Sequence, residues 1–171
     1  KLRALRPVQL IRQSDPAMPP GADHRAVLPL TERRTMKTLT QAMKDMLATQ
    51  TPIQATVTEG AIPNLGPKRS LRVYDDSTLI FNENTGGQTL TNMQNGSRIA
   101  VAVIDREKLD GYRFLGTPEL FTEGAPFDNA VAFAEKNGMK TPKFAVLVHI
   151  DEIWSLRSGP NAGKKMDELS A

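Results

Sequence analysis

The chain has 171 residues, 39% hydrophobic and 24% charged, which is ordinary for one soluble globular domain. Cysteine is absent, which excludes disulfides, thiolate metal sites and a cysteine nucleophile, and two separated histidines do not indicate a metal site. No apolar run is long enough to span a bilayer and no secretory signal is visible, so we expect a cytoplasmic protein without membrane contact.

The positive charge is concentrated at the N-terminus. Residues 1–35 hold seven Lys or Arg and three acidic residues, a net charge of +4, whereas the whole chain carries +3, so residues 36–171 carry −1. A folded basic face for nucleic acid is therefore not expected. Prolines interrupt every helix that residues 1–35 could form. We expect an extended arm, either one that docks on a partner subunit or an upstream extension before Met36, followed by one domain over 36–171.

A helix is predicted at the start of this domain. The sequence TLTQ at residues 38–41 has the form of a capping box that begins at Thr38, and Pro52 limits the helix to about Thr49. Apolar residues recur at helical spacing along one face, which we expect to lie in the core. These residues are Leu39, Met43, Met46 and Leu47.

Six short strands and one further helix are predicted after Pro52. Asp75-Asp76-Ser77 is expected to be the tight turn of a hairpin, and the tail from Ser158 is expected to be loose. Long helices between successive strands are missing, so the order favours a mainly β fold, a small antiparallel barrel with flanking helices, over a parallel sheet. The strands are predicted at 53–58, 69–74, 78–81, 99–104, 111–122 and 144–156, and the helix at 127–136.

The strand predicted at 99–104 reads IAVAVI and is apolar on both faces. One face of a barrel strand lies inside, so the other face is expected to be covered by a helix or by a second subunit. An obligate two-fold homodimer is the assembly that we predict from this strand.

The sequence NENTGGQTLTNM at residues 82–93 predicts a strand end, a glycine loop and a helix start. It is neither a Walker motif nor a GxGxxG fingerprint, and such glycines are often only turn formers. Lys68, Arg69 and Ser70 enter the strand that pairs with 78–81, so two cations and a hydroxyl could grip a phosphate beside the loop. A solvated charged loop is the alternative, above all for Lys68.

A search for catalytic residues finds neither a GxSxG nor an HExxH motif. His149 lies on an apolar strand and is interpreted as structural, and the adjacent Asp151 and Glu152 point to opposite faces of a strand. Catalytic residues stay unassigned and no metal ligands are predicted. Redox chemistry, if present, would have to be carried by a cofactor.

The order of motifs over about 38–157 resembles the pyridoxamine 5′-phosphate oxidase-like family, the FMN-binding split barrels. The motifs are EGAIPN, LRVYDDSTLIF, the loop into TLTNMQNGSRIAVAV, and LDGYRFLGTPEL. The resemblance implies a homodimer of six-stranded antiparallel Greek-key barrels with FMN at the subunit interface. The cofactor-binding residues that it implies are Lys68, Arg69, Ser70, Asn82, Glu83, Gly87, Gln88 and Thr89, with Trp154 contributed by the partner.

The sequence departs from that family at two places. Many relatives have a cation where this chain has Gln88, and the chain lacks the C-terminal part that holds pyridoxal phosphate in true pyridoxamine phosphate oxidases. The resemblance therefore implies an FMN-dependent oxidoreductase of unknown substrate rather than vitamin B6 oxidation. The alternatives are a non-catalytic flavin-binding or electron-transfer module and a degenerate dimeric barrel without flavin, and relatives also bind a deazaflavin or haem. Arg113 is a candidate for the substrate side or for a surface ion pair.

Overall fold

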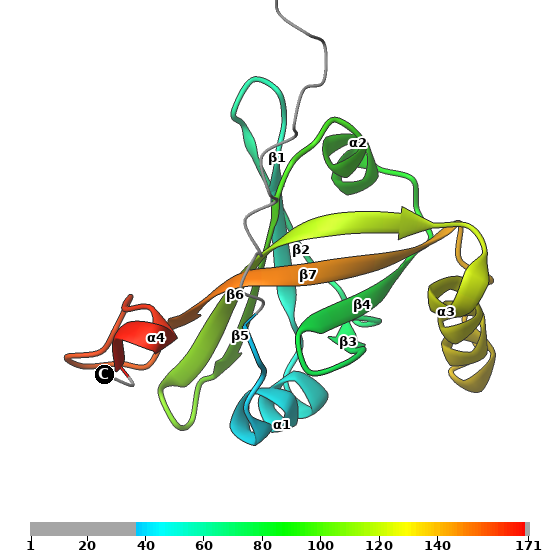
Figure 1. The fold of residues 1–171 in the computed structure, drawn as a ribbon. Coiled ribbons are helices and arrows are strands. Elements are labelled where there is room, and N and C mark those ends of the chain that lie inside the picture. The colour runs from blue at the N-terminus through cyan, green and yellow to red at the C-terminus, as the bar shows by residue number, and fades with distance from the viewer. Residues whose placement is uncertain (1–36, 170–171) are drawn as a thin grey trace, which may run out of the picture. The chain divides into compact units, whose positions relative to one another are not determined.

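The computed structural model describes residues 37–169, which form one antiparallel sheet of seven strands, rolled into a half-barrel and flanked by helices (Figure 1). The strand order is β2-β1-β5-β6-β7-β4-β3. The strands are β1 Ile53–Val57, β2 Pro63–Pro67, β3 Arg72–Val73, β4 Thr78–Glu83, β5 Ile99–Asp105, β6 Asp110–Phe121 and β7 Phe144–Ser155. The helices are α1 Gln41–Thr49, α2 Gln88–Gln94, α3 Gly124–Lys136 and α4 Met166–Leu169.

The mainly β split-barrel fold is confirmed, but the described sheet has seven strands rather than six. The additional strand is β2, which pairs with β1 from Ile53↔Pro67 to Val57↔Pro63. Its sequence, PNLGP, contains two prolines and a glycine, which are typical of a turn. Proline is tolerated here because β2 lies at the edge of the sheet, where its missing N–H leaves no ladder partner unpaired.

The main core fills the inside of the half-barrel, and α1 closes one end of it. The expected apolar face is confirmed for Met43, Met46 and Leu47 of α1, and Leu39 is buried in the same core but lies before the helix. The helix is capped by Thr40 rather than Thr38, because the Thr40 hydroxyl accepts a hydrogen bond from the Met43 amide at 3.4 Å. The strands contribute Leu79, Phe81, Ile99, Val101, Val103, Phe114, Val146, Val148, Ile150 and Ile153.

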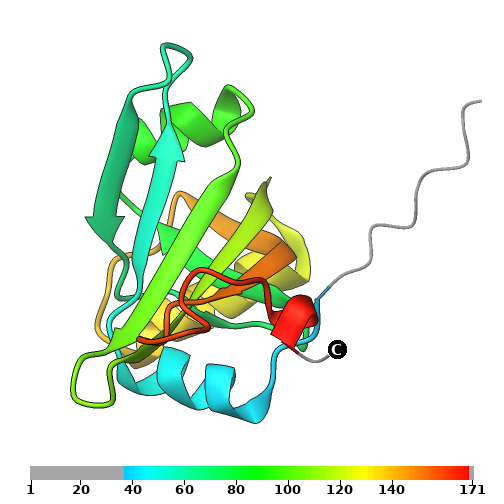
Figure 2. The same cartoon turned by 90° about the vertical axis from the view of Figure 1, so that its left-hand side faces the viewer.

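A second, smaller core lies between α3 and the outer face of β4 and β7 (Figures 1 and 2). Ile80, Ala130 and Ala145 are 0% exposed there, and Leu147 is buried beside them. The helix begins at Gly124, three residues before its predicted start. We call this part of the sheet, with α3 over it, the covered half.

The outer face of β1, β2 and β5 has no described helix over it, as Figure 2 shows for these three strands. The prediction that both faces of 99–104 are buried therefore holds for one face only in the single chain. Its outward residues Ala100 and Ala102 are half-buried, and Ile104 is 51% exposed. We call this face the bare face; it is extended by Ile53, Ala55, Val57 and Leu65, which lie on the same side of the paired strands.

The predicted loose tail is instead folded back on β7. The Ser155 amide donates to the Lys164 carbonyl at 2.9 Å, and the Gly163 amide donates to the Ser155 carbonyl at 2.9 Å. These hydrogen bonds join residues that local patterns do not connect, which is why the sequence did not reveal them. Within residues 37–169, no helix has the length and apolarity needed to cross a membrane.

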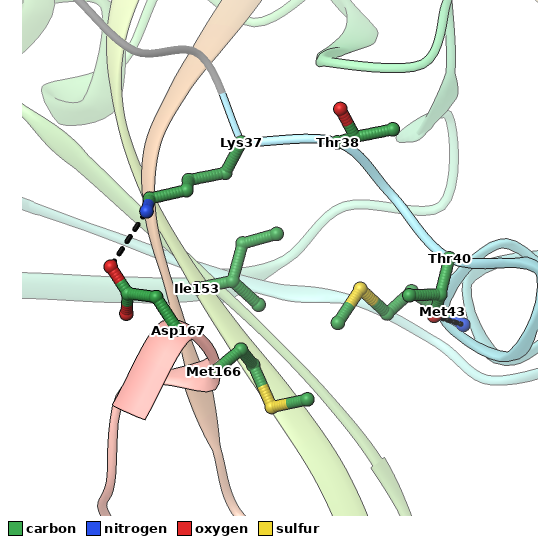
Figure 3. A pocket seen from close by; sticks show the side chains of 7 residues that line it. All are labelled: Lys37, Thr38, Thr40, Met43, Ile153, Met166 and Asp167. Carbon is green, nitrogen blue, oxygen red and sulfur yellow. Dashed lines mark hydrogen bonds and ion pairs between the residues drawn. The ribbon is translucent and has the colours of Figure 1, made fainter. Parts of the chain in front are cut away.

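Figure 3 shows a pocket of about 380 Å³ where the tail meets the segment before α1. Met43, Ile153 and Met166 give it an apolar floor, and the Lys37 ammonium pairs with the Asp167 carboxylate at 2.6 Å across it. The pocket lies against residue 37, where the described part of the chain begins. The Lys37–Asp167 ion pair ties the tail helix α4 to the segment before α1. We assign no ligand to the pocket.

Candidate functional site

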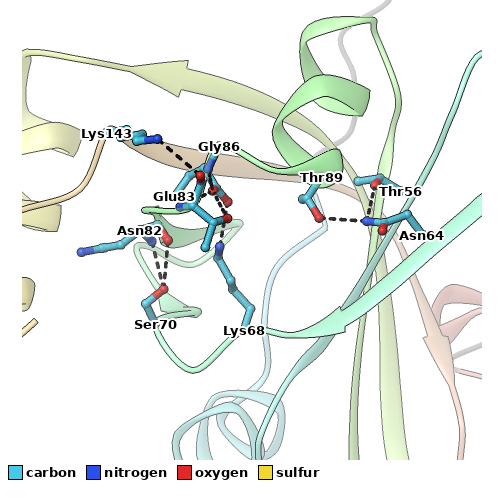
Figure 4. A network of polar contacts seen from close by, with 10 residues as sticks. Thr56, Asn64, Lys68, Ser70, Asn82, Glu83, Gly86, Thr89 and Lys143 are labelled. Atoms are coloured by element: carbon cyan, nitrogen blue, oxygen red, sulfur yellow. Dashed lines mark hydrogen bonds and ion pairs between the residues drawn. The ribbon is translucent and has the colours of Figure 1, made fainter. Parts of the chain in front are cut away.

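The loop after β4 encloses an anionic group, the side chain of Glu83. One carboxylate oxygen of Glu83 accepts hydrogen bonds from the Thr85 amide at 2.9 Å, the Thr85 hydroxyl at 2.8 Å and the Gly86 amide at 2.9 Å. The other oxygen accepts from the Lys68 ammonium at 2.8 Å (Figure 4). Glu83 itself is only 1% exposed. The loop therefore has the donors of an anion site, and they are directed at a residue of the same chain.

Lys143 completes this group of residues. Its ammonium donates to the Thr85 carbonyl at 3.3 Å, and its amide donates to the Glu83 carbonyl at 2.9 Å. Gly86 has φ +71°, a backbone conformation that favours glycine, and a Cβ at this position would push the Lys143 ammonium aside from 2.9 Å. We call Lys68, Glu83, Thr85, Gly86 and Lys143 the loop cluster.

The electrostatics of the loop cluster keep Glu83 ionised. Burial raises the pKa of Glu83, but the hydrogen bonds from Lys68, Gly86 and Thr85 and the charge of Lys68 outweigh burial, and the pKa lies below its ordinary value of 4.5. With Lys68 and Lys143 charged, the cluster carries a net charge of +1 at neutral pH. While Glu83 stays in place, this net charge attracts a further anion only weakly.

Ser70 and Asn82, which were predicted to bind a cofactor, form a buried clamp between β3, β4 and α3. The Ser70 hydroxyl accepts from the Asn82 amide at 3.1 Å and donates to the Asn82 carbonyl at 3.3 Å. The Asn82 side chain donates to the Ala130 carbonyl at 2.7 Å. Both residues are at most 3% exposed, so in this structure their polar groups serve the fold.

Arg69 does not join the loop cluster. Its side chain is exposed and lines a separate pocket of about 360 Å³, formed with the C-terminal end of α1 and Phe133 of α3. Lys68 and Arg69 are neighbours in the chain, but their side chains lie at different places. In this structure Lys68 lies at the loop cluster and Arg69 at the second pocket, and the expectation that both grip one phosphate stays a prediction.

Arg72 is an important residue that sequence reasoning missed. Its guanidinium donates to the Asn82 side chain at 3.3 Å and to the Asn129 side chain at 2.5 Å, and it lies 3.9 Å from the centre of the Phe133 ring. Burial lowers the pKa of Arg72 to about 10, which leaves it charged at neutral pH. Arg72 thus ties α3 to the strand that leads into the loop cluster.

Gln88 and Thr89 begin helix α2, which confirms the predicted strand, glycine loop and helix start; Gly87 is the N-cap. The Gln88 side chain donates to Asn92 of the same helix at 2.7 Å. The Thr89 hydroxyl accepts from the Asn64 amide group at 2.9 Å (Figure 4). The Asn64 contact holds α2 against the β1–β2 hairpin, and the bond within the helix leaves Gln88 outside the loop cluster.

Trp154 lies at the far end of β7 from the loop cluster. Glu83 pairs with Phe144, so Trp154 is ten residues further along the strand, a separation of about 33 Å at 3.3 Å per residue. The Arg113 guanidinium stacks over the Trp154 ring at 4.7 Å, and the Trp154 ring N–H donates to Glu152 at 3.0 Å. Trp154 of the same chain is therefore not part of the loop cluster.

The remaining titratable residues of β7 are engaged in surface pairs. The His149 ring lies 2.8 Å from the Glu119 carboxylate, and the Asp151 carboxylate accepts from Arg98 at 2.8 Å. Within the described part of the chain, three or more His, Asp or Glu side chains nowhere gather as metal ligands. The loop cluster is thus the most developed polar site that the structure describes.

Comparisons with known proteins agree with this architecture. The family described as pyridoxamine 5′-phosphate oxidase matches residues 39–157. An uncharacterized protein of Methanocaldococcus jannaschii is 32% identical over 130 residues, which cover 74% of this chain and 86% of the relative. The crystal structure of HupZ from Group A Streptococcus is 48% identical, covers 73% of this chain and 99% of its own, and has a TM-score of 0.67.

A more distant structure shares the fold alone. An FMN-binding protein of Syntrophomonas wolfei is 17% identical, with a TM-score of 0.58 over 67% of this chain and 83% of its own. The family match covers both the glycine loop and β7 with Trp154, and the strand order described above is the frame on which these segments lie. The chain belongs to the pyridoxamine 5′-phosphate oxidase family.

Proposed function

We propose that the protein is a homodimeric FMN-binding protein of oxidoreductase type, with the FMN phosphate at the loop cluster. The observation that carries this proposal is the set of four hydrogen bonds that the cluster directs at one carboxylate. Family membership supports a flavin as the cofactor, and one structure with this fold is that of an FMN-binding protein.

The donors of the loop cluster fit a phosphate group. Two backbone amides, a hydroxyl and a lysine are the groups that hold phosphates in many sites, and the Glu83 carboxylate stands in for such an anion here. Lys143 adds a second positive charge at the exposed rim of the loop. The residues that would hold the phosphate are therefore Lys68, Thr85, Gly86 and Lys143.

The bare face supports a homodimer. Exposed apolar residues at the centre of a sheet face are rare on a monomer and are typical of interfaces. Ile53 is 38% exposed, Val57 44%, Leu65 71% and Ile104 51%, and all lie on one side of three paired strands. A two-fold contact through this face would bury these side chains, and an obligate interface of this kind buries about 2,000 Å² or more.

Dimerisation would also bring Trp154 of the partner subunit toward the flavin. The length of β7 separates Trp154 from the loop cluster of its own chain. One flavin site would therefore consist of the loop cluster of one subunit and Trp154 of the other. Bound FMN supplies hydride or electron transfer, and the protein supplies its position and hydrogen bonds. The substrate and the electron donor are open parts of the proposal.

A second candidate is a dimeric barrel that binds no flavin. Glu83 favours it, because the carboxylate uses the same donors that a phosphate would need. The absorption spectrum of the purified protein, before and after addition of FMN, separates the two candidates. A yellow protein that releases FMN on denaturation supports the first, and a colourless protein that binds no FMN at saturation contradicts it.

Two variants locate the phosphate. Lys143→Ala removes a cation beside the loop and is expected to weaken FMN binding about tenfold, the value of one charge-assisted contact. Arg69→Ala is the matched change at a cation that lies in another pocket, and it is expected to leave the affinity unchanged. Both affinities are measured by fluorescence titration. If Arg69→Ala weakens FMN binding and Lys143→Ala does not, the phosphate binds in the Arg69 pocket instead.

A further inference from the structure

We propose that Glu83 is an internal competitor of anionic ligands, which occupies the loop cluster until an incoming anion displaces it or its charge is removed. The inference rests on the proposed function only in assigning the ligand's phosphate to the loop cluster. It gives Glu83 the opposite role to the one predicted from the sequence, where Glu83 was a cofactor-binding residue. In this role, Glu83 sets how tightly the site holds a phosphate.

The first argument is that Glu83 uses the donors completely. The amides of Thr85 and Gly86 each have one N–H, and both N–H groups point at the same Glu83 oxygen. A phosphate oxygen cannot accept from these amides while that oxygen is in place. Binding of a ligand and retention of the Glu83 contact are therefore mutually exclusive at these two donors.

The second argument is charge. Lys68 and Glu83 neutralise each other, so Lys143 provides the net charge of the loop cluster. Replacing Glu83 by glutamine would raise the net charge from +1 to +2 and would replace one acceptor oxygen by an NH2 donor. Both changes favour a dianion, since charge-assisted hydrogen bonds are the strong ones.

The third argument concerns access. Glu83 is buried, whereas Thr85 and Gly86, which cover it, are exposed. An anion that arrives from solvent reaches the rim of the loop and Lys143 first. The loop cluster can therefore exchange one anion for the other by rearranging the exposed residues 85–87, with β4 unchanged up to Asn82.

The test uses sulfate, which keeps its charge of −2 over the working pH range and contains no flavin. Sulfate is titrated at pH 7 into the wild type, Glu83→Gln and Glu107→Gln, and binding is followed by the amide resonances of Thr85 and Gly86. Glu107 is an exposed residue of the β5–β6 turn, so its variant changes the net charge equally at a remote place. We expect Glu83→Gln to bind sulfate at least tenfold more tightly than the wild type and Glu107→Gln to match the wild type.

A folded Glu83→Gln protein that binds sulfate no better than the wild type would overturn the inference. If this variant does not fold, Glu83→Asp serves instead, because its charge can still pair with Lys68 while its shorter chain withdraws from the amides. It is expected to bind sulfate severalfold more tightly than the wild type, and equal affinity would again overturn the inference.

The outcome is distinct from that of the proposed function. A wild type that binds no FMN, together with a Glu83→Gln variant that binds sulfate tightly, would reject the flavin and keep the inference. A wild type that binds FMN, with sulfate and FMN affinities unchanged in Glu83→Gln, would keep the flavin and reject the inference.

Discussion

The strands in both halves of the sheet have apolar residues on their outer faces, but these faces are covered differently. On the covered half, the outward residues Ile80 and Ala145 are 0% exposed beneath α3. On the bare face, Leu65 is 71% exposed and Ile104 51%. The comparison shows that an apolar strand face indicates burial but does not indicate by what: one half is covered by a helix of its own chain, and we propose that the other is covered by a second chain.

The comparison also separates stability from assembly. The covered half carries the buried clamp of Ser70 and Asn82 and the half-buried Arg72, which join α3 to β4 just before Glu83. The bare face carries exposed aliphatic side chains and half-buried alanines. Substitutions in the covered half should therefore lower the stability of the single chain, and substitutions on the bare face should lower its association.

The largest effect is expected from Ile80→Ala in the covered half. Removing a fully buried aliphatic side chain costs about 2–5 kcal/mol of unfolding free energy, because it leaves a cavity. Leu65→Ala is the matched change on the bare face and should cost about 0.5 kcal/mol or less in dilute protein. Urea unfolding measures both, and equal losses would mean that the two faces do not differ in this way.

Leu65→Lys is expected to convert the dimer into monomers. A lysine within an apolar interface must lose its hydration, so association should weaken by at least tenfold. Met139→Lys is the control, since Met139 is 36% exposed and follows α3 outside the bare face. Sedimentation velocity at micromolar concentration compares them, and a Leu65→Lys protein that remains a dimer would place the interface elsewhere.

Arg72→Lys tests the clamp of the covered half. Lysine keeps the positive charge, but it cannot donate hydrogen bonds to both Asn82 and Asn129 and at the same time stack on the Phe133 ring. The expected loss is about 1–3 kcal/mol of unfolding free energy. Arg69→Lys is the matched change at an exposed arginine of the same segment, and it should change the unfolding free energy by less than about 0.5 kcal/mol. A larger loss from Arg69→Lys would show that the exposed arginine has a structural partner.

The smallest effect is expected from acidification, and it should be local. The pKa of Glu83 is lowered in the folded protein, so the ionised carboxylate stabilises the fold fully above about pH 4.5. This contribution is lost as the pH falls through the pKa of the folded state. Amides of β4 should lose protection from hydrogen exchange before those of β1. In Glu83→Gln this difference between the two strands should disappear, and a difference that persists would assign it to another group.

Much of the fold could be predicted from the sequence because the patterns involved are local. The hairpin turn at 75–77, the glycine loop before Gln88 and the apolar face of α1 all follow from short-range periodicity and turn chemistry. The edge strand β2 could not, since its prolines and glycine are turn residues, and the capping residue of α1 was placed two positions too early. The return of the tail onto β7 depends on contacts that no local pattern contains.

The candidate site was predicted only in part, because its chemistry depends on the direction of side chains. Lys68 and the glycine loop do come together, as the hairpin prediction implied. Glu83 could be placed at the strand end but not recognised as the occupant of the loop, and Arg69 could not be seen to point elsewhere. Lys143 joins the site through the pairing of Glu83 with Phe144, a register between strands about 60 residues apart.

Sedimentation with FMN present tests the central claim most directly. The wild type is mixed with FMN, and its boundary is followed both in the protein absorption band and in the visible band of the flavin. We predict that the bound flavin sediments with a species of twice the mass of one chain, and that Leu65→Lys loses this flavin-carrying boundary together with the dimer. Flavin that sediments with the monomer, or that stays entirely with the free small molecule, would contradict the account.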